Sequence, residues 1–149
     1  MRGDPPDPAF VADLEFLENR DLDLSVRLGA MLGFNALLIT IGTHPVSASP
    51  GAPLSLDAAT QPWLTLASLA GIAPLVASCG FALRALLQGE EFDSEGLDGD
   101  AALRQRLFAS FVHSIDAQAK NLRRAIRWTF AGGVTTMAIW AVILATKIA

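Results

Sequence analysis

The sequence predicts an all-α integral membrane protein in which three helices cross the bilayer, and three observations support that prediction. Of the 149 residues, 52% are hydrophobic and only 17% are charged, whereas soluble domains carry about 25% charged residues. The charges are absent from three long apolar windows and crowded between them. Two windows continue into amphipathic segments, so we expect the first and third helices to extend into a cytoplasmic helical stalk.

The first helix is expected to begin in an amphipathic cytoplasmic segment, residues 8–26. Its apolar residues recur at helical spacing: Phe10, Leu14, Leu17, Leu24 and Leu28. The first span follows at residues 24–43, with Arg27 at the level of the lipid headgroups. Because neither proline nor glycine interrupts the join, we expect one rod of about 35 residues.

The second span is expected at residues 63–87, and the third at residues 126–148. Pro74 removes a backbone hydrogen bond in the middle of the second span and should kink it. A cytoplasmic helix at residues 101–125 leads into the third span, and its apolar stripe recurs at intervals of four or seven residues. The two segments together predict one helix of about 48 residues.

The loops differ in character. Three prolines and a glycine between His44 and Pro53 predict that the outer loop, residues 44–61, contains no helix. The other loop, residues 89–100, is acidic. It does not match a calcium-binding EF-hand, because the sixth position counted from Asp93 is Asp98, where that loop needs glycine. We therefore expect this segment to be a solvated turn.

The basic residues predict how the chain is oriented. With three spans, 10 of the 11 Lys and Arg residues fall on one side, and Lys147 alone lies at the other side, at the exit of the third span. That side is expected to be the cytoplasm. The protein is therefore predicted to be a multi-pass protein of the cell inner (plasma) membrane, with its N-terminus in the cytoplasm and its C-terminus outside. The first residues do not form a signal peptide, so insertion is expected to rely on the first span.

Small and polar residues in the spans are candidates for helix packing. Gly29 and Gly33 form a GxxxG pattern in the first span, and Gly132 and Gly133 give the third span a thin surface. These surfaces suit either internal packing or self-association. Asn35 is the one strongly polar group in the spans, and an interhelical hydrogen bond is favoured over a transport role.

A basic cluster precedes the third span. It consists of Lys120, Arg123, Arg124 and Arg127, which occupy about two helical turns. The ordinary orientation signal accounts for such a cluster. The alternative is a contact site for an anionic ligand, such as a lipid headgroup or a nucleotide.

No pattern predicts catalysis. His44 and His113 lie on opposite sides of the predicted membrane, and no zinc, phosphate-loop or nucleophile motif is present. The lone Cys79 is expected to be a small buried apolar residue. With a net charge of -4 and no long basic run, nucleic-acid binding has little support. We therefore predict a non-enzymatic protein with no catalytic residues, no metal and no cofactor.

Two stretches carry a resemblance to a known family. Residues 20–35 (RDLDLSVRLGAMLGFN) and 119–127 (AKNLRRAIR) resemble the first helix entry and the re-entry helix of the membrane effectors of Pycsar antiphage systems. The resemblance implies a homo-oligomer that impairs the inner membrane in response to a signal, and it carries over no ligand-binding residue. The competing hypothesis is an accessory subunit that packs on a larger respiratory or photosynthetic membrane complex.

Overall fold

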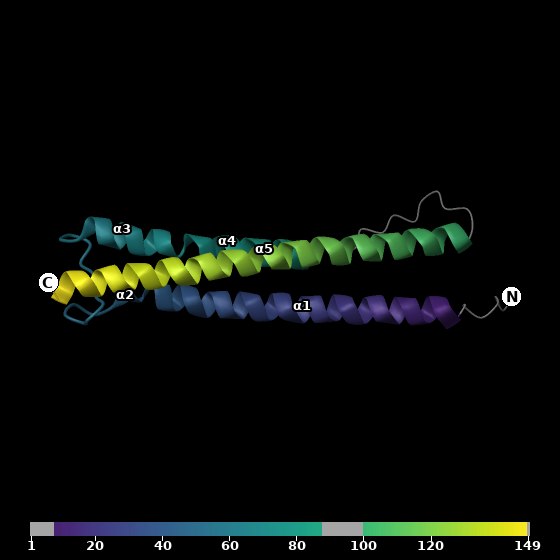
Figure 1. The fold of residues 1–149 in the computed structure, drawn as a ribbon, viewed down its shortest axis with the longest axis horizontal. Coiled ribbons are helices and arrows are strands. Elements are labelled where there is room, and N and C mark those ends of the chain that lie inside the picture. The colour runs from purple at the N-terminus through teal and green to yellow at the C-terminus, as the bar shows by residue number, and fades with distance from the viewer. Residues whose placement is uncertain (1–7, 88–99, 149) are drawn as a thin grey trace.

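The computed structural model describes residues 8–87 and 100–148, and the described residues form a long helical bundle (Figure 1). Helix α1 (Pro8–Gly42) has 35 residues and helix α5 (Asp100–Ile148) has 49. They run in the same direction along the long axis (Figure 1). At 1.5 Å per residue they extend about 52 Å and about 74 Å. Both expected rods are therefore continuous helices.

The returning segment consists of two helices, α3 (Pro62–Gly71) and α4 (Ala73–Leu86), separated at Ile72. Pro74 lies in the first turn of α4, where its missing N–H has no helical partner to lose. A new helix begins after Ile72, since the amides of Leu75 and Val76 both donate to the Ile72 carbonyl. The kink expected from Pro74 is therefore an interruption two residues before the proline.

Three segments are long and apolar enough to cross a membrane: α1, the α3–α4 segment and α5. Each of the two long helices also has a charged portion. We call residues 8–27 and 100–127 the charged half of the bundle, and residues 28–42, 62–83 and 128–146, which contain no charged side chain, the apolar half. For the described residues, the predicted all-helical fold with three segments long and apolar enough to cross a membrane is confirmed.

One expectation about the loops is wrong. The segment after α1 contains a one-turn helix, α2 (His44–Ser47), where the prolines predicted none. Pro45 occupies the first turn of α2, and the amides of Val46 and Ser47 both donate to the Thr43 carbonyl. A proline is tolerated in a first turn because no helical acceptor awaits its N–H there. The expected acidic turn, residues 89–100, lies outside the described residues except for Asp100, which begins α5.

The buried core lies where α1, α4 and α5 meet around the boundary of the two halves. It contains Leu17, Leu24, Leu28, Ala82, Ala85, Ile115, Leu122 and Ala125. The alanines of α4 allow its backbone to approach the larger leucine and isoleucine side chains of α1 and α5. This core fixes which faces of α1 and α5 remain outward.

Candidate functional site

Three buried polar side chains, one from each long segment, form a hydrogen-bonded group that we call the polar triad: Asn35 of α1, Ser78 of α4 and Thr129 of α5. The Asn35 amide nitrogen donates to Ser78 Oγ at 2.8 Å. Thr129 Oγ1 donates to Asn35 Oδ1 at 2.8 Å, and Ser78 Oγ donates to the Ala125 carbonyl, also at 2.8 Å. Asn35 and Ser78 are fully buried.

The chemistry of the polar triad is structural. Its hydroxyl and amide groups satisfy one another, and the described contacts include no acid or base that would activate the Ser78 hydroxyl. An interhelical hydrogen bond in an apolar environment contributes about 0.6–2 kcal/mol. Asn35 therefore makes the interhelical contacts expected of it, while Ser78 and Thr129 are partners that the sequence analysis missed. The available signal was their hydroxyl groups inside otherwise apolar windows.

Gly132 allows a close approach between α5 and α4. A Cβ atom built on Gly132 would lie 2.6 Å from the Leu75 side chain and 3.1 Å from the Leu75 backbone nitrogen. Two further close approaches were not anticipated: Gly42 lies against Ile72, and Gly71 lies against Ile139. Small residues thus serve internal packing mainly around the α3–α4 segment.

The GxxxG pattern of α1 has no partner within the described chain. A Cβ atom on Gly29 or Gly33 would meet nothing within 4 Å. The two glycines lie on an outward surface of α1 with Leu22, Val26 and Leu37, which are 63%, 63% and 56% exposed. We call these five residues the outer face of α1. Gly133, the neighbour of Gly132, is equally open.

The basic cluster lies at the end of the charged half of α5, and its members point in different directions. Arg124 lies over the ring of Phe81 on α4, 5.9 Å from its centroid. Arg123 donates to the Ala119 carbonyl of its own helix at 3.4 Å, while Lys120 and Arg127 are exposed. Arg27 of α1 pairs with Asp23 at 2.9 Å, the one ion pair between described residues.

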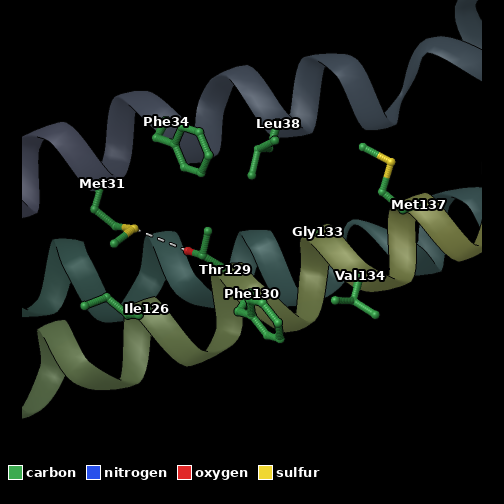
Figure 2. Close-up of a pocket in the computed structure, with 9 residues that line it drawn as sticks. All are labelled: Met31, Phe34, Leu38, Ile126, Thr129, Phe130, Gly133, Val134 and Met137. Atoms are coloured by element: carbon green, nitrogen blue, oxygen red, sulfur yellow. Dashed lines mark hydrogen bonds between the residues drawn. The ribbon is translucent and has the colours of Figure 1, made fainter.

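An apolar groove lies between α1 and α5, mainly in the apolar half of the bundle (Figure 2). It encloses about 590 Å³ and is lined by Met31, Phe34, Leu38, Ile126, Thr129, Phe130, Gly133, Val134 and Met137. Figure 2 shows Phe34 and Leu38 pointing from α1 toward α5. The one polar lining group, the Thr129 hydroxyl, is held by Asn35 and by the sulfur of Met31 at 3.3 Å. We call this feature the α1–α5 groove.

Lys147 ties the far end of α5 to the loop that follows α2. Its Nζ donates to the carbonyl of Ser55 at 2.6 Å and to that of Ala52 at 3.2 Å. The ammonium thereby satisfies loop carbonyls near the C-terminal end of α5, where a positive charge also complements the helix dipole. The sequence analysis assigned Lys147 only to the exit of the third span.

These features define a helical protein with three candidate membrane spans, held together by buried hydroxyl and amide groups and by close glycine contacts. No group of three His, Cys, Asp or Glu side chains is placed to hold a metal ion among residues 8–87 and 100–148. No protein-family model, curated protein or solved structure matches the chain.

Proposed function

We propose that this chain is a non-enzymatic, multi-pass protein of a bacterial-type inner membrane that works as a homo-oligomer. The observation that carries the proposal is the outer face of α1. A Cβ atom on either of its glycines would meet nothing within 4 Å among the described residues, and the face extends from the apolar half into the charged half. The outer face of α1 is therefore the proposed contact between copies.

The composition of this face favours protein as its cover. Gly33 and Leu37 lie in the apolar half, where lipid can cover them. Leu22 lies in the charged half, five residues before Arg27, where lipid tails do not reach. Burial of an exposed leucine side chain is worth about 1.5–3 kcal/mol, and glycines allow helices to approach closely. A partner that follows this face across the membrane surface needs a span with a helical extension. The α1 helix of a second copy has that form.

The proposed role of the assembly is to impair the inner membrane in response to a signal. The support for this role is the resemblance of residues 20–35 and 119–127 to the membrane effectors of Pycsar systems. The packing of the chain is consistent with such a role, since the polar triad joins the three spans into a unit that can associate as a whole.

Gly33→Leu tests the proposal, with Gly80→Leu as its matched control. Both glycines are open to a Cβ, but Gly80 lies on α4, away from the outer face of α1. In mild detergent the wild-type chain and Gly80→Leu should have the mass of a homo-oligomer, and Gly33→Leu should shift toward the monomer. Overproduction of the wild type should lower the membrane potential, and Gly33→Leu should reduce that effect.

Two results would count against the proposal. An unchanged mass of the Gly33→Leu variant would remove the outer face of α1 as the contact. Recovery of the wild-type chain from its source membrane with other proteins in a fixed stoichiometry, and as a monomer when expressed alone, would instead assign it as an accessory subunit of a larger complex.

A further inference from the structure

The α1–α5 groove does not end at its lining residues but continues toward the charged half. A second hollow of about 370 Å³ is lined by Arg27, Ala30, Met31, Phe34, Leu122 and Ile126. It shares Met31, Phe34 and Ile126 with the α1–α5 groove. The two hollows therefore form one continuous surface depression along the bundle, with Met137 near one end and Arg27 at the other.

The α1–α5 groove itself, without the second hollow, matches one leaflet of a bilayer in length. Ile126 and Met137 are 11 residues apart on α5, which corresponds to about 16 Å along the helix. Half of the hydrocarbon core of a bilayer is about 15 Å. An extended hydrocarbon chain that begins at the level of Ile126 would thus end near Met137.

The interior of the groove suits hydrocarbon and not a polar group. The Thr129 hydroxyl already donates to Asn35 and lies against the sulfur of Met31. The single proton of that hydroxyl is thus already donated, so the base of the groove offers no free donor to a polar occupant, and burying an unpartnered polar group would be unfavourable. An occupant of the deep part of the groove is therefore apolar along its length.

The open end of the groove carries two arginines and one carboxylate, which leaves a net positive charge. Arg27 lines it on the α1 side, where it pairs with Asp23 at 2.9 Å. On α5, Arg123 precedes Ile126 by three residues and Phe130 by seven, so helical periodicity places it on the same side as these two groove residues. Arg124 lies instead over Phe81 on α4. The basic cluster is thus divided, and only part of it faces the groove.

We propose that the α1–α5 groove binds one acyl chain of an anionic phospholipid, whose phosphate lies between Arg27 and Arg123. The proposal rests on the membrane location proposed above. The apolar interior, the length of one leaflet and the cationic end together fit a molecule with a hydrocarbon chain and an anionic headgroup. The outer face of α1 is a different surface, so the site can be tested separately from self-association.

Gly133 offers a way to close the groove without disturbing the bundle. It lines the groove, and a Cβ atom on it would meet nothing within 4 Å. The Gly133→Leu side chain would occupy the space assigned to the acyl chain. Gly80→Leu is the matched control, because Gly80 is equally open but is not among the residues that line the groove.

The experiment is native mass spectrometry of the full chain in detergent, with phosphatidylglycerol and phosphatidylcholine of identical acyl chains added in equal amounts. The wild type and Gly80→Leu should retain phosphatidylglycerol preferentially, and Gly133→Leu should retain at least tenfold less of it. Arg27→Gln and Arg123→Gln should each lower the preference for phosphatidylglycerol by about fivefold, since a basic residue contributes about 1 kcal/mol toward an anionic lipid. Both arginines are exposed, so these variants should keep the fold.

Equal retention of the two lipids by the wild type would overturn the proposal, as would undiminished retention by Gly133→Leu. A wild type free of bound lipid, together with a loss of the oligomer in Gly133→Leu, would assign the groove to a second copy of the chain. Because Gly33→Leu should keep the bound lipid while losing the oligomer, failure of the lipid site and failure of the proposed self-association give different results.

Discussion

At the scale of single residues, the polar triad is the feature that joins the three apolar segments most specifically. Hydrophobic packing alone distinguishes poorly between helices in lipid, because lipid tails are as apolar as leucine side chains. Hydrogen bonds are directional, and Asn35 uses both its amide nitrogen and its carbonyl oxygen to reach two other helices. The triad therefore selects one rotational position for each of the three helices.

Thr129→Val should weaken the bundle, because valine keeps the shape of threonine but removes the hydroxyl that donates to Asn35 Oδ1. We expect a loss of about 1–2 kcal/mol in the free energy of unfolding in detergent. Thr40→Val is the control, since the Thr40 hydroxyl is exposed and donates only to the Ala36 carbonyl of its own helix. Equal stabilities of the two variants would show that the triad contributes nothing specific.

At the scale of the helices, neighbouring glycines of α5 have opposite surroundings. Gly132 lies against Leu75 of α4, at the start of the helix that follows the break at Ile72. Gly133 lies one residue further along and opens into the α1–α5 groove. Adjacent residues on a helix are rotated by about 100° around its axis. Only one of the two glycines can therefore face α4, and the packing of α4 on α5 decides that Gly132 is the one that cannot carry a larger side chain.

Gly132→Ala should therefore destabilise the bundle, and Gly133→Ala should not. The added methyl group of Gly132→Ala would be 2.6 Å from Leu75 Cδ2 and 3.1 Å from the Leu75 nitrogen, and overpacking of this kind costs about 1–3 kcal/mol. Gly133→Ala is the matched control and should be neutral or more stable by about 0.5 kcal/mol, because alanine favours the helix. Thermal unfolding of both proteins in the same detergent checks the difference.

At the scale of the whole molecule, the bundle is an elongated object whose two halves differ in charge. The parallel helices α1 and α5 place both charged portions at the same end (Figure 1). Ten of the 11 basic residues would then face the cytoplasm, and Lys147 would hold the loop on the other side. The proposed orientation follows from this asymmetry.

Cysteine labelling tests the orientation, starting from a Cys79→Ala chain that has no thiol. In intact cells a membrane-impermeant maleimide should label Ser49→Cys, in the loop after α2, and should not label Ala109→Cys, on the charged half of α5. Both positions are exposed. After the membrane is opened, both should react. The reverse pattern would invert the proposed topology.

Much of the architecture follows from local properties of the sequence. The length of each apolar window and the absence of proline and glycine between residues 101 and 131 predict long continuous helices, because helix formation depends on near neighbours in the chain. The prolines did not predict the one-turn helix α2, because Pro45 is a first-turn residue there and does not break the helix. Local patterns also identified Asn35 as a polar group in need of a partner.

The sequence by itself thus determined the number, the length and the approximate limits of the apolar segments, but not the break at Ile72 that divides the second segment into α3 and α4. Only the tertiary structure decided the function of each small or polar residue: Gly132 packs inside the bundle while Gly29 and Gly33 face outward, and Ser78 joins Asn35 across 43 positions of the chain. The physical reason is that apolar length is a property of each segment alone. The rotation of one helix against another depends on contacts between residues far apart in sequence.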